Sequence, residues 1–277
     1  HPFFCGFVLF LWEDEMVKIG GFGHIVDYLQ IAAAGYDFAE LDIPEIAVLS
    51  GSELKDFRQK IKKGSPVLIA SRLLPVTEPL FFKIGFEPES LRAYLEKACQ
   101  KTAELGIRAL ILGNGKARSM LSPSDRQKED VFIETLSLMA EIAAKNQQEI
   151  ILEPLGPRYS NYINTIEQAV YIIQKVGKDN LFTMADLRHM VGSKDKFDSI
   201  VRYLPYIHHL HIDYPLSYPE RLYPAVGDGY DYSSFFAAIK KSGYTGTLTV
   251  EADVPNNWQM AYKKVEMLLA AYRSIFI

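Results

Sequence analysis

Four side chains that can bind a metal ion or move a proton stand at the ends of four apolar runs in the second half of the chain. They are Glu153, Asp186, His211 and Glu251. Three carboxylates with one imidazole form an oxygen-rich set that suits Mn²⁺ or Mg²⁺. Co²⁺ or Zn²⁺ are further options, although no thiolate belongs to the set. We therefore expect these four residues to hold one divalent ion.

The alternation of residue types predicts that the four side chains point the same way. In a barrel strand, alternate residues face the helix layer and the barrel interior. The runs ending at Glu153, His211 and Glu251 place leucine, isoleucine or valine at the alternate, helix-facing positions. The run ending at Asp186 follows the same phase less cleanly. Carboxylates brought together in this way repel each other unless a cation or bound protons compensate, and a cation is the simpler expectation.

Further polar residues accompany the four. His189 lies just beyond the run that ends at Asp186, and Arg221 lies in the loop after the seventh expected strand, 207–213. We expect both to bind substrate oxygens, with a loop salt bridge as the alternative for Arg221. His209 is expected to be a satisfied core histidine, because a single strand histidine is more often structural than catalytic. His208 is expected to face outward or to lie at a helix interface.

These residues need elements that bring distant parts of the chain together. Short apolar runs alternate with amphipathic stretches, which is typical of βα units on a parallel sheet. Eight units favour closure into a single (β/α)8 barrel, the TIM barrel, at whose carboxyl-terminal mouth active sites lie. The expected strands are 17–21, 38–43, 66–71, 109–113, 149–154, 181–186, 207–213 and 247–252. The expected helices are 24–34, 52–63, 88–105, 123–146, 165–176, 195–204, 231–242 and 257–275.

Length and composition agree with one such domain. The chain has 277 residues, 48% of them hydrophobic, and a net charge of −4. This charge and the absence of a basic patch argue against a nucleic-acid partner. The two cysteines are far apart, which favours a reducing, cytoplasmic location. We assign the catalytic barrel to 16–277 and interpret 1–15 as an upstream extension or a docked strand, because Met16-Val-Lys-Ile-Gly resembles a chain start that leads into a strand. The apolar run within 1–15 is too short to span a membrane.

With these residues in place, the sequence resembles the sugar isomerase/epimerase superfamily of xylose-isomerase-like barrels. Ketose 3-epimerases, hydroxypyruvate isomerases and inosose dehydratases belong to that superfamily. The resemblance is carried by Ile-Leu-Glu153-Pro-Leu, Asp186-Leu-Arg-His189, His211-Ile-Asp213 and Thr-Val-Glu251. It implies that the same four residues bind one divalent metal, that Glu153 and Glu251 form the acid/base pair, and that His189 and Arg221 bind substrate. Gly113-Asn-Gly115 departs from the His-x-Gly that many members carry after the fourth strand.

The resulting expectation is a metal-dependent isomerase or epimerase that transfers protons through an enediolate on a ketose or cyclitol. An inosose-type dehydratase and a non-catalytic sugar-binding barrel are the alternatives. No Lys/Arg cluster is evident near the mouth, so the substrate is expected to be unphosphorylated. Phe81, Phe82 and Phe86 either form an apolar wall over the ligand or pack on the surface of the third expected helix, 88–105. A homo-oligomer, dimer or tetramer, is also possible.

Overall fold

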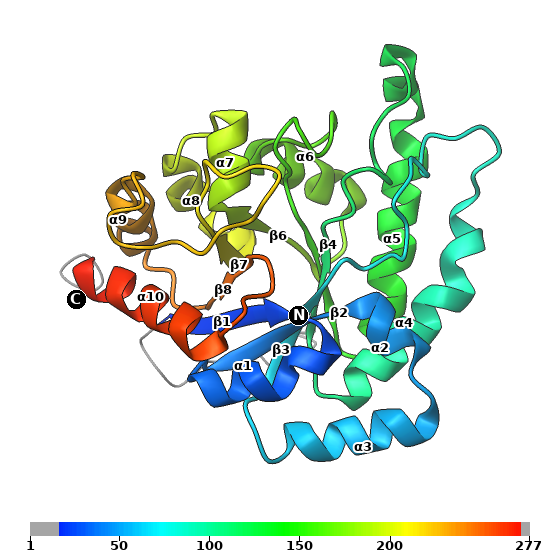
Figure 1. Cartoon of the computed structure of the whole chain (residues 1–277). Coiled ribbons are helices and arrows are strands. Elements are labelled where there is room, and N and C mark those ends of the chain that lie inside the picture. The colour runs from blue at the N-terminus through cyan, green and yellow to red at the C-terminus, as the bar shows by residue number, and fades with distance from the viewer. Residues whose placement is uncertain (1–16, 273–277) are drawn as a thin grey trace, which may run out of the picture.

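A closed barrel of eight parallel strands forms the centre of the molecule in the computed structural model (Figure 1), which describes residues 17–272. Residues 1–15, expected to be an extension or a docked strand, lie outside the described residues. The strands pair in chain order, and β8 closes the barrel against β1. Their bounds are β1 Lys18–Gly23, β2 Phe38–Asp42, β3 Val67–Ser71, β4 Ala109–Leu112, β5 Glu149–Leu152, β6 Leu181–Asp186, β7 Ile207–Ile212 and β8 Thr247–Val250.

Helices connect consecutive strands and cover the outside of the barrel (Figure 1). They are α1 Tyr28–Ala34, α2 Ile43–Val48, α3 Gly51–Ile61, α4 Arg92–Glu104, α5 Glu129–Lys145, α6 Ile166–Val176, α7 Leu187–Ser193, α8 Asp198–Arg202, α9 Ser233–Ser242 and α10 Trp258–Ala271. Short 3-10 turns are η1 Ile25–Asp27, η2 Pro88–Leu91, η3 Pro123–Lys128 and η4 Leu204–Tyr206. The single (β/α)8 barrel expected from the sequence is confirmed. Two short helices, α2 and α7, were not expected.

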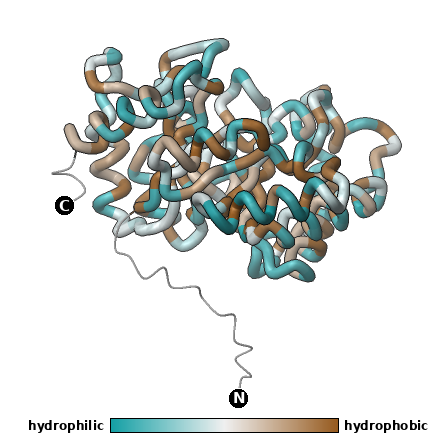
Figure 2. Tube along the Cα trace, turned by 60° about the horizontal axis from the view of Figure 1, so that its bottom comes forward, coloured by the Kyte–Doolittle hydropathy of each residue, from teal (hydrophilic) through white to brown (hydrophobic). Residues whose placement is uncertain are grey.

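Hydrophobic residues fill two separate regions. The larger one lies between the strands and the helices, where Leu210, Leu248 and Val250 are fully or almost fully buried. The smaller one fills the barrel itself with Phe38, Ile69, Ala109, Ile111, Ile151 and Met184. Figure 2 shows hydrophilic and hydrophobic segments alternating along the outer helices, as expected for helices that bury one face. No helix among residues 17–272 is long and apolar enough to cross a membrane.

His208 packs against the neighbouring strands β6 and β5, whereas the sequence indicated that it faces outward or lies at a helix interface. Its ring stacks on Phe182 with the centroids 3.4 Å apart, and its Nδ1 lies 2.9 Å from Glu149 Oε2 at the start of β5. The pairing of β6 with β7 shifts register between Thr183 and Met184. A strand irregularity of this kind changes the direction of a side chain relative to strict alternation, which explains the error.

Thr165 caps the N-terminus of α6, because its hydroxyl accepts a hydrogen bond from the backbone N–H of Gln168. We expect Thr165→Ala to destabilise the protein by about 1 kcal/mol and to lower Tm by roughly 2–4 °C. Thermal unfolding followed by circular dichroism measures this change. Thr165→Ser keeps the acceptor and serves as the control. An alanine variant that melts with the wild type would show that the cap contributes nothing.

Candidate metal centre and active site

Four consecutive strands bring the four expected ligands together at the mouth of the barrel. Glu153 directly follows β5, Asp186 ends β6, His211 lies in β7 and Glu251 directly follows β8. One ligand atom from each residue lies within 4.8 Å of the others. His211 Nδ1 is 3.6 Å from Glu153 Oε1, 3.6 Å from Asp186 Oδ2 and 3.1 Å from Glu251 Oε2. The inward phase predicted from the sequence therefore describes all four residues.

Three of these ligand atoms are buried without a hydrogen bond. Within residues 17–272, Glu153 Oε1 and His211 Nδ1 have no hydrogen-bond partner, and Glu251 Oε2 makes no hydrogen bond of standard geometry, although it forms an ion pair with Arg221. Buried polar atoms are normally paired, and leaving one unpaired is costly. A divalent cation between them would satisfy all three at once. The oxygen-rich donors, the single imidazole and the unpaired atoms all fit such an ion.

The charges of the group depend on one another. Burial by itself lowers the pKa of His211, but the negative charges of Glu40 and Glu251 outweigh burial and raise the pKa well above its usual value. For Glu251, burial raises the pKa, while Arg221 and His211 outweigh it and lower the pKa overall. Glu251 is therefore an ionised carboxylate at neutral pH, as a metal ligand or a proton acceptor must be.

Glu40 holds the other side of the His211 ring. It is a fully buried residue in the middle of β2, and its two carboxylate oxygens both lie 3.2 Å from His211 Nε2. The Nε2–H group of His211 donates to this carboxylate, so Nδ1 faces the three acidic ligands. A carboxylate behind a ligating histidine fixes the ring and its tautomer. Sequence reasoning missed Glu40, although an acidic residue in the apolar run Phe38-Ala-Glu-Leu was a visible signal.

Glu40, His209 and His211 form a second cluster with suitable ligand types. Here, however, the polar atoms satisfy each other. His209 Nε2 lies 3.1 Å from Glu40 Oε2, and His209 Nδ1 lies 2.7 Å from Thr247 Oγ1. This agrees with the interpretation of His209 as a satisfied core histidine. The cluster of Glu153, Asp186, His211 and Glu251 is therefore the candidate metal centre.

Asp186 serves two elements. Its Oδ1 accepts a hydrogen bond from the backbone N–H of His189 and so caps the short helix α7, while its Oδ2 faces His211. The cap places His189 beside the cluster, with Nε2 3.7 Å from Glu153 Oε1. Burial lowers the pKa of His189, so its ring is neutral at neutral pH. Its Nδ1 has no hydrogen-bond partner in the described part of the chain.

Arg221 reaches back to the same carboxylates from the loop after β7. Its guanidinium lies 2.6 Å from Glu251 Oε2, 3.2 Å from Asp186 Oδ2 and 3.0 Å from Asp213 Oδ2. Arg188 shares Asp213 at 2.6 Å and donates to carbonyls of the same loop. Arg221 thus lies in the site, where it offsets part of the negative charge. Its binding of substrate stays a prediction.

Glu153 is positioned from behind by Arg118. This fully buried guanidinium donates to the backbone carbonyls of Glu153, Leu112 and Ile163, and burial lowers its pKa to about 10. It therefore remains charged at neutral pH. In front, Gly113 leaves the necessary room, because a Cβ atom there would lie 2.2 Å from Glu153 Oε2. Any larger residue at 113 would displace the carboxylate.

Asn114 lies in the loop that departs from the His-x-Gly pattern, and its side chain does not face the cluster. Its side chain accepts from the backbone N–H of Leu74 and donates to the carbonyl of the same residue, which joins the loops after β3 and β4. Phe81 and Phe82 are buried and pack against Phe132 of α5, which corresponds to the fourth expected helix and not to the third.

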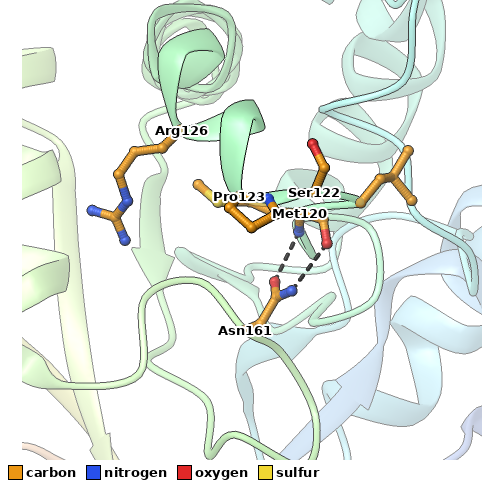
Figure 3. A pocket seen from close by; sticks show the side chains of 6 residues that line it. Met120, Ser122, Pro123, Arg126 and Asn161 are labelled. Atoms are coloured by element: carbon orange, nitrogen blue, oxygen red, sulfur yellow. Dashed lines mark hydrogen bonds between the residues drawn. The ribbon is translucent and has the colours of Figure 1, made fainter.

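Two pockets lie near these loops. One, of about 340 Å³, opens between the ends of β2, β3 and β4 and includes Gly113. The other, of about 360 Å³, lies at η3, where Asn161 pairs with the backbone of Met120 and Arg126 lies at the side (Figure 3). Neither pocket is lined by a cluster residue, but the first includes Gly113, which lies against the Glu153 carboxylate.

Fold and site together define a (β/α)8 barrel with a carboxylate–imidazole cluster at its mouth that could hold a metal ion. A family model described as the xylose isomerase-like TIM barrel matches residues 29–270. The chain belongs to this family.

Relatives and solved structures agree with this membership. D-psicose 3-epimerase of Agrobacterium fabrum is 23% identical over 87% of this chain and 81% of its own length. A putative hydroxypyruvate isomerase of Mus musculus is 28% identical over 45% of this chain, and the match spans 46% of that protein. A crystal structure of D-psicose 3-epimerase in the presence of D-fructose superposes with a TM-score of 0.76 at 18% identity, covering 94% of this chain and 99% of that one. A structure of the IOLI protein with a bound zinc atom reaches 0.72 at 18% identity, covering the same shares.

Uptake of a divalent ion by the metal-free protein should release protons. The pKa of His211 is raised, so the folded metal-free protein carries an imidazolium at pH 7, whereas a metal ligand needs the free Nδ1 lone pair. We expect one Mn²⁺ per chain, with an apparent affinity that falls as pH decreases. Calorimetry in two buffers of different ionisation enthalpy counts the protons released. Asp186→Asn, which lacks one ligand, is the control, and uptake without proton release would contradict the assigned charge of His211.

Proposed function

We propose that the protein is a metal-dependent sugar isomerase or epimerase that moves a proton next to a carbonyl group. The observation that carries the proposal is the position of Glu153 and Glu251, whose carboxylate oxygens approach the same imidazole from β5 and β8. Two carboxylates on either side of one small space can act as acid and base on one substrate. Mn²⁺ or Mg²⁺ is the expected ion, with Co²⁺ or Zn²⁺ as alternatives.

Each glutamate has a defined task in this proposal. One of the two, Glu153 or Glu251, removes the carbon-bound proton beside the carbonyl and leaves an enediolate. The other returns a proton, at the same carbon for epimerisation or at the neighbouring carbon for isomerisation. A divalent ion, when bound, supplies Lewis-acid stabilisation of the developing negative charge.

His189 and Arg221 complete the proposed site. The neutral ring of His189 has a free Nδ1 and can hold a substrate hydroxyl. The pKa of Arg221 is raised well above its usual value, because the attraction of Glu251, Asp186 and Asp213 outweighs its burial. It remains a permanent cation near any oxyanion that forms.

Several relatives are named ketose 3-epimerases or hydroxypyruvate isomerases, which supports a sugar-like carbonyl substrate. The inosose-type dehydratase would begin with the same proton removal and then expel water. Product analysis distinguishes it from an isomerase. A non-catalytic sugar-binding barrel would exchange no substrate proton. A cytoplasmic location and a homo-oligomer remain predictions.

Glu251→Gln should lower turnover by about 10²–10⁴-fold while leaving the fold intact. An amide cannot accept the substrate proton, whereas packing around β8 comes from Leu248 and Val250. The measurement is exchange of a ketose C–H proton with deuterated water in the presence of Mn²⁺, paired with a thermal melt. Glu141→Gln, on the exposed face of α5, is the matched control. Exchange within a few-fold of wild type would remove Glu251 from the mechanism.

Glu40→Gln should weaken Mn²⁺ binding by about 10- to 100-fold, because the amide orients His211 less firmly than the carboxylate does. Metal competition assays give the dissociation constant. Thr247→Val is the matched control, since it removes the partner of His209 Nδ1 and perturbs the same buried network without touching His211. If both variants bind Mn²⁺ equally well, Glu40 is only a structural brace.

A further inference from the structure

A second group of polar residues, which the proposed mechanism does not use, lines the other side of the barrel mouth. The pocket of about 340 Å³ is lined from the ends of β2, β3 and β4 and contains two basic residues, Arg72 and Lys116. They are 44 positions apart in the sequence, so no basic cluster was visible there. Asp42 is the acidic residue among those that line this pocket.

Arg72 is held in an unusual conformation. It directly follows β3 and has φ of 56°, in the left-handed region that costs energy for residues other than glycine. Its Nε donates to Asp42 Oδ1 at 2.7 Å, and the Asp42 side chain is only 4% exposed. The Arg72 side chain itself is 50% exposed. Strained backbone that is fixed by a buried carboxylate commonly marks a functional position.

The outer part of the guanidinium is available. Within residues 17–272, neither Nη1 nor Nη2 of Arg72 has a hydrogen-bond partner, since its single ion pair is made through Nε. Two parallel N–H groups on one guanidinium match the two oxygens of a carboxylate. Lys116 adds a second positive charge to the pocket, so the charge of Asp42 does not neutralise it.

The pocket borders the proposed reaction centre at Gly113. Gly113 lines it, and a Cβ atom at Gly113 would lie 2.2 Å from Glu153 Oε2. Strand β4 alone separates β3 from β5. Two strand spacings put the backbone of Arg72 roughly 10 Å from the carboxyl-terminal end of β5. A sugar whose reacting carbons lie beside Glu153 therefore extends over Gly113 toward Arg72.

We propose that Arg72 binds a carboxylate at the end of the substrate remote from the reacting carbons, so that the preferred substrate is an acidic sugar. This inference rests on the proposed function for the location of the reacting carbons. A substrate carboxylate fits this pocket better than a phosphate does. Arg72 and Lys116 supply two positive charges, and Asp42 offsets one of them, which matches the single negative charge of a carboxylate. The side chain of Asn114, in the glycine-flanked loop, already forms hydrogen bonds with the backbone of Leu74 and adds no donor for the substrate.

Three sugars that differ only at C6 test the proposal. D-fructose carries a hydroxymethyl group there, D-fructuronate a carboxylate and D-fructose 6-phosphate a phosphate. Calorimetry on protein incubated with Mn²⁺ gives the dissociation constant of each sugar, and exchange in deuterated water gives its rate of proton transfer. We expect D-fructuronate to bind about 10- to 100-fold more tightly than D-fructose. Arg72→Met should abolish this preference, and Arg72→Lys should retain part of it.

Arg126→Met is the matched control, because Arg126 lines the separate pocket at η3 (Figure 3). It should leave the preference unchanged. Equal binding of D-fructose and D-fructuronate by the wild type would overturn the proposal, as would a preference that survives Arg72→Met. Tightest binding of the phosphate would replace the carboxylate assignment. A carboxylate preference without proton exchange on any sugar would refute the proposed function and leave the role of Arg72 standing.

Discussion

The repulsion among three buried carboxylates is the constraint on which the site depends. Glu153, Asp186 and Glu251 each approach His211 Nδ1 within 3.6 Å. Charges this close interact strongly where water is excluded, and an unpaired buried charge is destabilising. The positive charges of the His211 imidazolium and of Arg221 partly neutralise these carboxylates. A divalent cation among the unpaired ligand atoms would do so more completely.

Neighbouring residues fix the positions of the cluster side chains. Glu40 holds the far nitrogen of His211, while Arg118 holds the backbone on which Glu153 stands. Asp186 is fixed by its second role as the cap of α7. Three of the four ligands are thus held in place by atoms that the cluster does not use. Such preorganisation matters because small displacements of catalytic groups cost large factors in rate.

The closed barrel divides its mouth into two chemically different halves. Strands β5 to β8 contribute the acidic cluster, and the ends of β2 to β4 contribute a pocket with Arg72 and Lys116. Gly113 lies where the two halves meet, beside Glu153. One half can therefore carry the proton transfer while the other selects the substrate, which is how barrels of one architecture differ in specificity.

The sequence by itself determined the barrel and the four cluster residues, because strand alternation and βα repetition are local patterns. Hydrophobic residues at every second position fixed the inward phase of Glu153, His211 and Glu251. Only the tertiary structure revealed Glu40, since its contact with His211 spans 171 positions and depends on closure of the barrel. The same holds for the basic pocket, whose residues meet because neighbouring strands end at one rim. Irregular register also moved His208, since a strand shift depends on the paired strand and leaves no local pattern.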